Sequence, residues 1–445
     1  MGFGDKSSSK SAVQKHSQLK AKILEEVSER REEMIGFLQS LVRIPSVVGK
    51  EGNVQKFMEK TFRGLGLAVD VWEPDFKELK KHPAYFRTTS YTKFGYKGRP
   101  NVVGKLKGGG QGKSLMLAGH VDVVSPEPVT EWKHDPWGAE IVGNELYGRG
   151  SADMKGGVTS MVYALKCVLE SGIRLKGDVT VATTIEEEDG GIGGTLATIL
   201  KGYRADAAIN PEPTDGCNIG IASAGVMYFR VKIVGKPAHA ATAHFGVNAI
   251  DKILKIHQAL TELNKERQTT IRYAPAETSP EMKGRVTTIN IGKISGGDWP
   301  STVAGWAELE SRIGWPPGEE LENVKREIER TIEKVAKRDP WLRDHPPIVE
   351  WFGWRAEPHE QDPQHPFVQT VAKLVKDVTR RKPMLVGGAA GLDTRFFVRY
   401  ANIPAITLGP RGLNLHSTDE HVNLESVVET AKVIALTIVD WCGYK

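Results

Sequence analysis

Residues 115–122 read LMLAGHVD, an apolar run that leads directly into a histidine and an aspartate two positions apart. A short apolar run followed by a turn is typical of a buried strand in a parallel sheet. Side chains two positions apart on an extended segment share a face, so His120 and Asp122 are expected to face one crevice at the carboxyl end of the strand. Zinc accepts imidazole, and a nearby carboxylate can orient the ring. An exposed loop start would show the same two residues, so this motif does not decide alone.

Short apolar strands and apolar-periodic helices alternate on both sides of this run. Strands are expected at Val102–Leu106, Leu115–Ala118, Val179–Thr183, Ala207–Ile209 and Ala405–Leu408. Helices are expected between about Leu19 and Arg43, and at Val158–Leu169, Phe367–Val378 and Glu425–Trp441. This alternation is typical of an α/β layer structure with a mixed, largely parallel sheet.

The pattern changes from about Gly225 to strand, helix, strand, strand, helix, strand. The six segments are Val226–Val234, Val247–Leu263, Thr287–Ile294, Ala304–Arg312, Leu321–Lys337 and Ile348–Trp354. Their order resembles a split βαβ unit of the ferredoxin-like type. A chain of 445 residues is too long for one ordinary core. We therefore expect a disordered tail at residues 1–14, a first domain formed by residues 15–224 and 356–445, and an α+β domain inserted at residues 225–355.

Composition limits the classes of function. Hydrophobic residues make up 40% of the chain, charged residues 26%, and the net charge is only +5, as in soluble globular proteins. The short basic runs lack the aromatic interleaving of a nucleic-acid-binding surface, and no apolar run reaches the roughly 20 residues that cross a bilayer. The cysteines Cys167, Cys217 and Cys442 form no CxxC pair, which argues against a disulfide framework or a thiolate zinc site. We expect a cytoplasmic protein without nucleic-acid or membrane partners.

Residues 148–157 read GRGSADMKGG, a glycine-rich turn directly before the helix expected at Val158. Glycine lets the backbone bend closely around a bound ion, and Asp153 stands where one carboxylate can bridge two metal ions. A helix N-cap is the alternative role for Asp153.

Residues 186–189 read EEED, directly after an apolar strand and before the glycine-rich segment 190–194. Four adjacent acids repel one another unless a cation or solvent relieves the charge; a solvated loop is the alternative. The segments NPEPT at 210–214 and HSTDE at 416–420 add further polar residues late in the chain. Together the motifs supply the histidine and carboxylate ligands that zinc, manganese and cobalt accept.

The ordered set GHVDVV, GRGSADMKGG, EEEDGG, NPEP, GKPAHAATAHFGVNAI and HSTDEHV resembles the two-zinc (co-catalytic) metallopeptidase and amidohydrolase family. That family includes acetylornithine deacetylase, succinyl-diaminopimelate desuccinylase, aminoacylase, glutamate carboxypeptidase and formylaminopyrimidine deformylase. The resemblance covers nearly the whole chain. It implies a zinc-exopeptidase-like catalytic domain with an inserted dimerisation or lid domain, and a deacylase that hydrolyses the amide C–N bond of an N-acyl amino acid or N-acyl amine.

The resemblance also implies roles for single residues. One metal ion would be held by His120, Asp153 and Glu212, and a second by Asp153, Glu188 and His416. The two divalent ions are expected to be zinc, with manganese or cobalt as alternatives. The peptide bond between Asp153 and Met154 is expected to be cis.

Three further residues match positions with catalytic roles in the family. Glu187 matches the general base, and Asp122 matches the carboxylate that orients His120. His239 matches a histidine of the inserted domain that reaches across a homodimer to stabilise the oxyanion. The expected partners are accordingly a small-molecule amide substrate and a second copy of the chain.

The match is weaker on the substrate side. Many members carry an asparagine where Ser301 stands here, and an arginine near Gly314, whereas this chain has Arg312 two residues earlier. Gly391 and Arg411 lie in loops that resemble the substrate-side loops of the family. Ser301, Arg312, Gly391 and Arg411 are therefore candidate substrate contacts, and a surface position is the alternative for Arg411.

Three other functions stay open at this point. A dipeptidase or carboxypeptidase and a hydrolytic deaminase of an aromatic amine are compatible with the same scaffold, whereas the presence of Glu187 and every expected ligand argues against an inactive binding relative. The stretch Lys80–Asn101 is rich in aromatic residues. It either lines a pocket for an aromatic or heterocyclic substrate or packs on the sheet.

Overall fold

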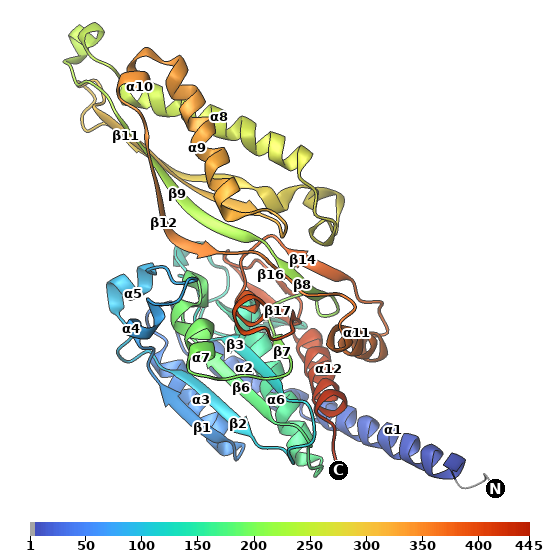
Figure 1. Ribbon diagram of the computed structural model, residues 1–445. Helices are drawn as coiled ribbons and strands as arrows, with labels where there is room; N and C mark the ends of the chain where they lie inside the picture. Colours follow the sequence, from blue (N-terminus) through green and yellow to red (C-terminus); the bar gives the residue numbers. More distant parts are fainter. Residues whose placement is uncertain (1–4) are drawn as a thin grey trace.

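The computed structural model describes residues 5–445, with side chains from Gln14 onward. The chain forms two units joined at a narrow waist, and the inserted segment lies above the rest of the chain in Figure 1. The beginning of the first described helix and the C-terminus both lie at the far end of the lower unit. None of the helices within the described residues is long and apolar enough to span a bilayer.

The lower unit is built on a nine-stranded sheet. Its strands are β1 (Ala68–Trp72), β2 (Asn101–Leu106), β3 (Leu115–His120), β6 (Val179–Thr184), β7 (Ala208–Asn210), β8 (Ile219–Ser223), β13 (His359–Glu360), β14 (Leu385–Gly388) and β15 (Ala405–Thr407). They follow the order β1-β2-β6-β3-β7-β15-β8-β13, and β14 pairs with β8. β3 pairs in parallel with β6 and β7, and β7 with β15, whereas β1, β2 and β13 pair antiparallel. The predicted mixed, largely parallel sheet is confirmed.

Helices cover both faces of this sheet, because its buried strands are apolar on both sides. One face carries α1 (Asp5–Glu29), α2 (Arg31–Val42), α3 (Gly52–Gly64), α6 (Gly156–Glu170), α11 (Pro366–Thr379) and α12 (Leu424–Cys442). The other face carries α4 (Phe76–Leu79), α5 (Thr89–Phe94) and α7 (Ala197–Leu200). Along β3, Leu115 and Leu117 belong to the first core, and Met116 and Ala118 belong to the second. The alternation of side chains along one strand therefore feeds two separate cores.

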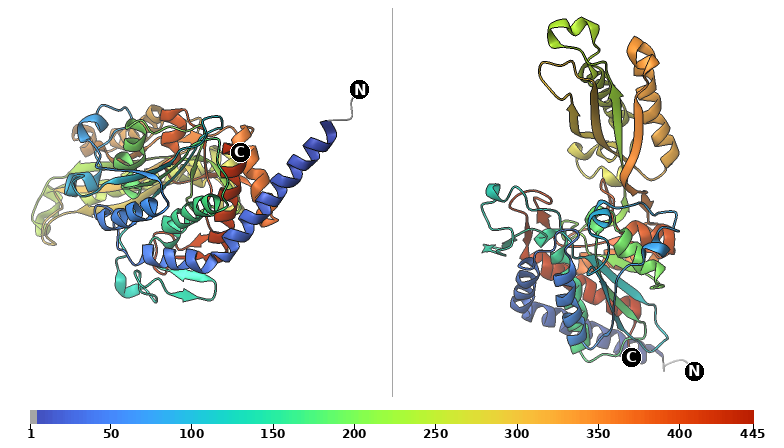
Figure 2. Two further views of the ribbon diagram at one scale, coloured as in Figure 1. Left: turned by 90° about the horizontal axis from the view of Figure 1, so that it is seen from below. Right: turned by 90° about the vertical axis from the view of Figure 1, so that its left-hand side faces the viewer.

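The inserted unit has a sheet and a core of its own. Its elements are β9 (Gly225–Val234), α8 (Ala249–Thr270), β10 (Ile289–Gly296), β11 (Trp306–Trp315), α9 (Leu321–Arg338), α10 (Pro340–Asp344) and β12 (Ile348–Ala356). The strands pair antiparallel in the order β10-β11-β9-β12. Apolar residues of α8 and α9 pack against β9 and β11, so both helices lie on one side of the sheet (Figure 2). This is the ferredoxin-like order that the sequence pattern predicted.

A third, small sheet joins two distant parts of the chain. It consists of β4 (Ile141–Val142), β5 (Glu145–Tyr147), β16 (Gly412–Leu413) and β17 (His421–Asn423), in the antiparallel order β16-β17-β5-β4. β5 ends directly before the GRGSADMKGG segment, and β16 and β17 flank the loop that carries His416. Pairing of β17 with β5 therefore holds these two motifs side by side.

The structure differs from the sequence prediction near the N-terminus. Helix α1 begins at Asp5, so residues 5–14 of the expected disordered tail are helical, and residues 1–4 lie outside the described part of the chain. No glycine or proline occurs between Asp5 and Gly36, so the sequence of the expected tail contains neither of the residue types that most disfavour a helix. The single helix expected between Leu19 and Arg43 is divided at Arg30 into α1 and α2.

Gly157 allows α6 to approach the segment that follows β7. A Cβ atom at this position would lie 1.8 Å from the carbonyl oxygen of Pro211, which is main chain and cannot rotate away. Since Glu212 is the next residue, this contact also places α6 beside a predicted metal ligand. The second glycine of the ADMKGG segment is therefore required by packing.

Replacing Gly157 with alanine is expected to lower the free energy of unfolding by about 1–3 kcal/mol, the usual range for overpacking. The matched control is Gly36→Ala in α2, where a Cβ atom would meet nothing within 4 Å. This control is expected to raise the free energy of unfolding by up to about 1 kcal/mol, because alanine is the better helix former. Denaturant unfolding of both variants measures the difference, and equal stability of the two variants would contradict the packing role.

Candidate metal centre

Neighbouring strand ends bring four predicted site residues together. His120 is the last residue of β3, Glu187 and Glu188 follow β6, and Glu212 follows β7. β3 lies between β6 and β7 and pairs in parallel with both. Carboxyl ends of parallel strands meet at one edge of a sheet, so these side chains share that edge.

Two loops outside the strands complete the cluster. Asp153 lies in the segment directly before α6, and His416 lies between β16 and β17. The peptide bond between Asp153 and Met154 is cis, as the resemblance implied. All five residues that the sequence predicted as metal ligands therefore lie in one cluster.

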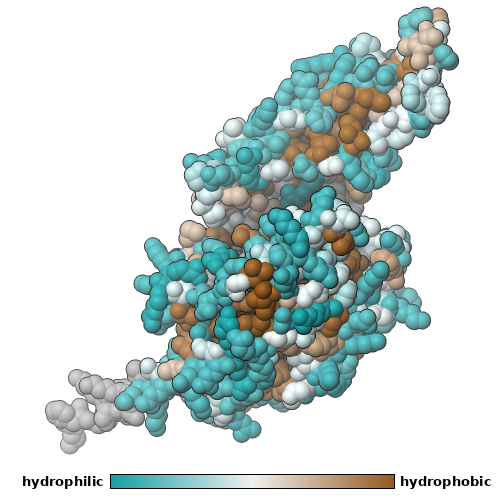
Figure 3. Space-filling model, turned by 180° about the vertical axis from the view of Figure 1, so that it is seen from behind, coloured by the Kyte–Doolittle hydropathy of each residue, from teal (hydrophilic) through white to brown (hydrophobic). Residues whose placement is uncertain are grey.

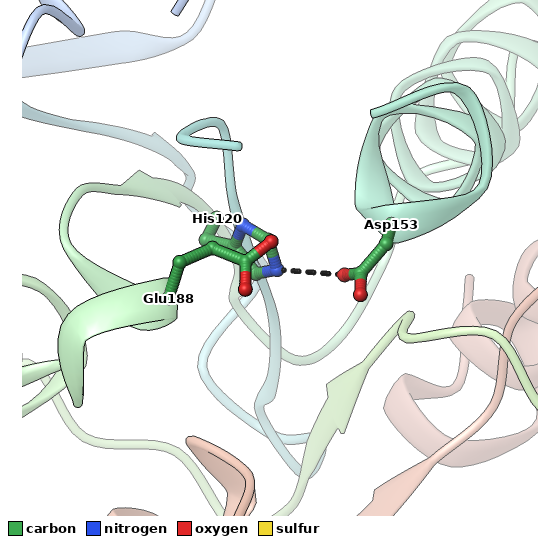
Figure 4. Close-up of side chains that lie close together, drawn as sticks. All are labelled: His120, Asp153 and Glu188. Atoms are coloured by element: carbon green, nitrogen blue, oxygen red, sulfur yellow. Dashed lines mark hydrogen bonds and ion pairs between the residues drawn. The ribbon is translucent and has the colours of Figure 1, made fainter. Parts of the chain in front are cut away.

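Asp153 lies between the two histidines. Its Oδ1 is 3.2 Å from Nε2 of His120, and its Oδ2 is 3.3 Å from Nε2 of His416. Nε2 of His120 is also 3.2 Å from Oε1 of Glu212, and Nε2 of His416 is 2.9 Å from Oε2 of Glu188. Figure 4 shows Asp153 and Glu188 reaching His120 from opposite sides. The arrangement is that of two ligand groups that share one carboxylate.

Asp122 bonds the imidazole of His120 through its main-chain carbonyl and the EEED segment through its carboxylate. Nδ1 of His120 donates to the main-chain carbonyl of Asp122 at 2.9 Å, and the carboxylate of Asp122 is 3.7 Å away from that nitrogen. The carboxylate instead accepts the main-chain N–H groups of Glu187 at 3.2 Å and Glu188 at 3.1 Å. Two consecutive residues of the acidic loop are therefore oriented by one buried carboxylate.

The carboxylates of the cluster have displaced pKa values. Burial raises the pKa of Glu187 well above its ordinary value, and burial together with the charge of Asp153 raises that of Glu188. Burial raises the pKa of Glu212 to about 8. Burial would also raise the pKa of Asp153, but its hydrogen bonds to His120 and His416 hold the pKa well below its ordinary value.

The histidines respond to the same negative charge. Burial lowers the pKa of His120, but Glu212 and Asp153 outweigh this effect and raise it well above its ordinary value. Hydrogen bonds to Asp153 and Glu188 raise the pKa of His416 to about 11. Such values indicate a site whose acidic groups favour added positive charge.

The residues fit divalent metal ions. Oε1 of Glu188 is buried and has no hydrogen-bond partner, whereas buried carboxylate oxygens are normally paired. Ligand atoms of His120, Asp153 and Glu188 lie within 4.8 Å of one another, as do those of His120, Glu187 and Glu212. Imidazole nitrogen and carboxylate oxygen are the donors that zinc, manganese and cobalt accept.

Glu186, the first acid of the EEED segment, holds neighbouring segments together through hydrogen bonds. Its carboxylate accepts the hydroxyl groups of Thr88 at 2.6 Å, Ser90 at 2.6 Å and Tyr96 at 2.9 Å, together with the main-chain N–H of Gly193 at 2.7 Å. These hydroxyl groups come from the aromatic stretch Lys80–Asn101, so that stretch packs onto the acidic loop. Glu186 is occupied by these contacts, whereas Oε2 of Glu187 lies 4.0 Å from Nε2 of His120.

The residues predicted in or near the inserted unit lie in two places. His239 is exposed, its Nδ1 accepts the main-chain N–H of Ala241 at 3.0 Å, and the carbonyl of Ser301 accepts the N–H of Ala240 at 2.9 Å. His239 and Ser301 therefore lie close together in the inserted unit. Arg312 reaches from β11 into the lower unit, where it donates to the carbonyl of Ala389 at 2.9 Å.

The two remaining predicted substrate contacts belong to the lower unit. Gly391 is buried, and a Cβ atom there would lie 2.9 Å from Cβ of Ala356 and 3.3 Å from the ring of Trp354. Arg411 is exposed, and its main chain bonds Ser426 and Asn423. Sequence reasoning assigned no role to Glu420 or Arg149, which are both buried beside Asp153. Their positions inside the HSTDE and GRGSADMKGG motifs were the available signal.

Comparisons with known proteins agree with this geometry. Residues 116–440 match the family described as peptidase family M20/M25/M40. The chain is 32% identical to an N-formyl-4-amino-5-aminomethyl-2-methylpyrimidine deformylase of Bacillus subtilis, over 94% of this chain and 97% of the relative. The chain belongs to the peptidase family M20/M25/M40, and it is a metal-dependent amide hydrolase of that family.

Solved structures show the same fold at low sequence identity. Human carnosine dipeptidase 1 is 16% identical and superimposes with a TM-score of 0.73, over 95% of this chain and 99% of its own. A dinuclear metal-binding peptidase of Bacillus subtilis is 15% identical with a TM-score of 0.63, over 93% of this chain and 99% of its own. The predicted fold class and the predicted family are confirmed.

Stripping divalent ions with a chelator is expected to lower the melting temperature, and adding Zn²⁺ or Mn²⁺ is expected to restore it. A ligand that binds only the native state stabilises it by about 2.7 kcal/mol at a concentration of 100 times Kd. Protons compete with metal ions for groups of raised pKa, such as His416 and Glu212. The gain is therefore expected to fall as the pH drops from about 8 to about 6. Thermal unfolding with and without the metal ion at both pH values measures the gain in stability, and calorimetric titration measures the metal affinity. A chelator-treated protein of unchanged melting temperature would contradict the metal assignment.

Proposed function

We propose that this protein is a deacylase that hydrolyses the amide C–N bond of a small N-formyl or N-acyl amine with the help of two divalent ions, most simply zinc. The observation that carries the proposal is the cluster in which Asp153 lies between His120 and His416. The choice of a deacylase over a dipeptidase or carboxypeptidase is supported by the 32% identity to the deformylase over nearly the whole chain.

In this proposal His120, Asp153 and Glu212 hold one ion, and Asp153, Glu188 and His416 hold the other. Bound divalent ions would supply Lewis acidity toward the carbonyl oxygen and lower the pKa of a water molecule. Asp122 keeps the main chain of the acidic loop in place through its two hydrogen bonds. The main chain that carries Glu187 and Glu188 is therefore fixed by the protein itself.

Glu187 is the proposed general base. It is buried 4.0 Å from Nε2 of His120, and its neighbour Glu186 is fully engaged with Thr88, Ser90 and Tyr96. A base in this position takes a proton from the attacking water and gives it to the amine nitrogen as the C–N bond breaks. His239 is the proposed donor to the oxyanion.

Aromatic side chains beside the acidic loop support an amine with a planar ring. A Cβ atom at Gly190 would lie 2.3 Å from the ring of Phe86 and 3.0 Å from the ring of Trp354, so both rings close on this glycine. Trp354 follows Gly353, which has a φ of 61°, where the pairing of β12 with β9 shifts register. The ring of Tyr228 lies 6.2 Å from that of Trp354. Aromatic walls with a few polar groups are typical of sites for ring-shaped ligands.

Arg312 is the proposed polar contact for that ligand. It is half-buried beside these rings, and burial lowers its pKa. One terminal nitrogen is held by the carbonyl of Ala389, and Arg312 Nη1 would lie 3.7 Å from a Cβ atom at Gly314. Its guanidinium thus lies beside Gly314, near which many family members carry an arginine. Ser301, Gly391 and Arg411 remain proposed contacts of lesser weight.

A panel of N-formyl-4-amino-5-aminomethyl-2-methylpyrimidine, an N-acetyl amino acid and a dipeptide tests this function. The metal-loaded enzyme is expected to hydrolyse the formyl amide fastest. Glu187→Gln is expected to keep both metal ions and to lose at least about 10²-fold in kcat, because an amide cannot accept the proton. Preferred hydrolysis of the dipeptide would reassign the protein to the dipeptidases, and an active Glu187→Gln variant would move the base elsewhere.

We also propose a homodimer formed through the inserted unit. β10 is an edge strand, and Ile294 on it is 50% exposed. Two further large apolar side chains lie near His239. They are Phe245, which is 65% exposed, and Trp299, which is 69% exposed. Apolar side chains also gather on the inserted unit when it is viewed from behind (Figure 3). An open edge strand with apolar neighbours suits pairing with a twofold mate.

Mixing inactive Glu187→Gln chains with inactive His239→Ala chains tests whether sites are shared between subunits. Random exchange in a twofold dimer is expected to leave about a quarter of all sites with both an intact Glu187 and an intact His239. Recovery of activity after mixing measures this fraction. Demonstrated subunit exchange without any recovery would place the role of His239 within its own subunit.

A further inference from the structure

Glu420 is a buried carboxylate that the proposed mechanism leaves without a role. It is the last residue of the HSTDE segment, directly before β17, and it is 0% exposed. A buried ionised carboxylate is costly unless every acceptor site is used. Its partners therefore show what the carboxylate is for.

All partners of the Glu420 carboxylate belong to the GRGSADMKGG segment. Oε1 accepts the main-chain N–H groups of Ala152 and Asp153, each at 3.0 Å. Oε2 accepts the main-chain N–H of Gly150 at 3.0 Å and Nη1 of Arg149 at 2.7 Å. Four donors thus converge on one carboxylate, and one of them is the amide of the residue that lies between the two histidines.

Two further hydrogen bonds join the same two segments through main-chain carbonyl groups. Arg149 donates from Nη2 to the carbonyl of Ser417 at 3.0 Å, and Gly148 donates from its main-chain N–H to the carbonyl of Glu420 at 2.8 Å. Ser417 directly follows His416, which has a left-handed φ of 59°. Arg149 therefore bonds both Glu420, which holds the main chain of Asp153, and Ser417, which follows His416. These contacts link the loop of Asp153 to the loop of His416.

We propose that Glu420, together with Arg149, is a positioning residue for the metal centre and sets the placement of Asp153 relative to His416. This role rests on the proposed function, because it matters for catalysis only if Asp153 and His416 hold metal ions. Asp122 orients the acidic loop by accepting the N–H groups of Glu187 and Glu188. Glu420 does the same for the loop of Asp153, so each of these two loops is held by a buried carboxylate.

Only an acceptor without hydrogen atoms can serve four donors in this geometry. Glutamine at position 420 keeps the shape of the side chain, but its NH₂ group faces N–H groups of the loop and repels them. Partners of metal ligands, when replaced, typically cost about 10–100-fold in metal affinity or activity. We therefore expect Glu420→Gln to weaken metal binding by about 10–100-fold.

The matched control is Asp339→Asn in the inserted unit. Asp339 is likewise buried, at 3% exposure, and its carboxylate accepts the main-chain N–H groups of Trp341 and Leu342 and the side chains of Lys252 and Lys255. Loss of this acceptor is expected to lower thermal stability without changing metal affinity. The pair of variants separates a general cost of a broken buried network from a specific effect on the metal centre.

The experiment is calorimetric titration of Mn²⁺ and of Zn²⁺ into metal-stripped wild type, Glu420→Gln and Asp339→Asn, with thermal unfolding of each metal-free protein. If Glu420→Gln does not fold, Arg149→Lys is titrated instead. Lysine keeps the positive charge but loses the second contact of Arg149, which is the contact to Ser417. Metal affinity is then expected to fall by only about a few fold. Metal affinity equal to wild type in the folded variant overturns the positioning role. Wild type that binds no metal overturns the proposed function itself. If wild type binds two ions but does not hydrolyse the formyl amide, the proposed substrate is wrong, and weaker metal binding by Glu420→Gln still supports the positioning role.

Discussion

Asp153, Glu187, Glu188 and Glu212 place four carboxylates in one cluster with two imidazoles, and the repulsion among these charges is the constraint on which the surrounding structure depends. Burial disfavours the ionised form of each acid and the neighbouring like charges add to this effect, which explains the raised pKa values of Glu187, Glu188 and Glu212. Asp153 is the exception because it lies between both histidines. The cluster is compatible with a folded chain only where fixed donors and added cations offset its charge.

The fold meets this constraint with rigid supports close to each acid. Parallel strands β6, β3 and β7 end at one edge, so the acids that follow β6 and β7 lie beside His120 without long connections. Asp122 and Glu420 then accept main-chain N–H groups of the loops that carry Glu188 and Asp153. Gly157 allows α6 to lie directly against Pro211. Each support uses a group that has little freedom to move, which suits a site that must hold charge in a defined geometry.

In the proposed function, the inserted unit supplies substrate contacts and no metal ligand. The side chains of Arg312 on β11 and Trp354 on β12 reach the loops of the lower unit that carry Ala389, Gly190 and Gly391. A rotation of the inserted unit would move these contacts together with the wall of the site. The same unit presents exposed apolar side chains, so one insertion serves both the proposed substrate contacts and the proposed assembly of two chains.

The sequence by itself determined the type of each long element, the two-unit architecture and the residues of the cluster. Periodicity is a local property, so β3, β6, α6 and α12 were predictable from their apolar patterns. The HxD, ADMKGG, EEED, NPEP and HSTDE motifs contain every predicted metal ligand, and the resemblance to a known family assigned each of these residues its role.

Only the tertiary structure decided which acids are bound by hydroxyl groups and which face the histidines. Glu186 and Glu187 are neighbours in the sequence, yet only the fold brings the hydroxyl groups of Thr88, Ser90 and Tyr96 onto the first and His120 toward the second. The same holds for Glu420, whose donors lie about 270 residues earlier in the chain. Hydrogen bonds between distant segments leave no period or local pattern in the sequence, so they became visible only once the chain was folded.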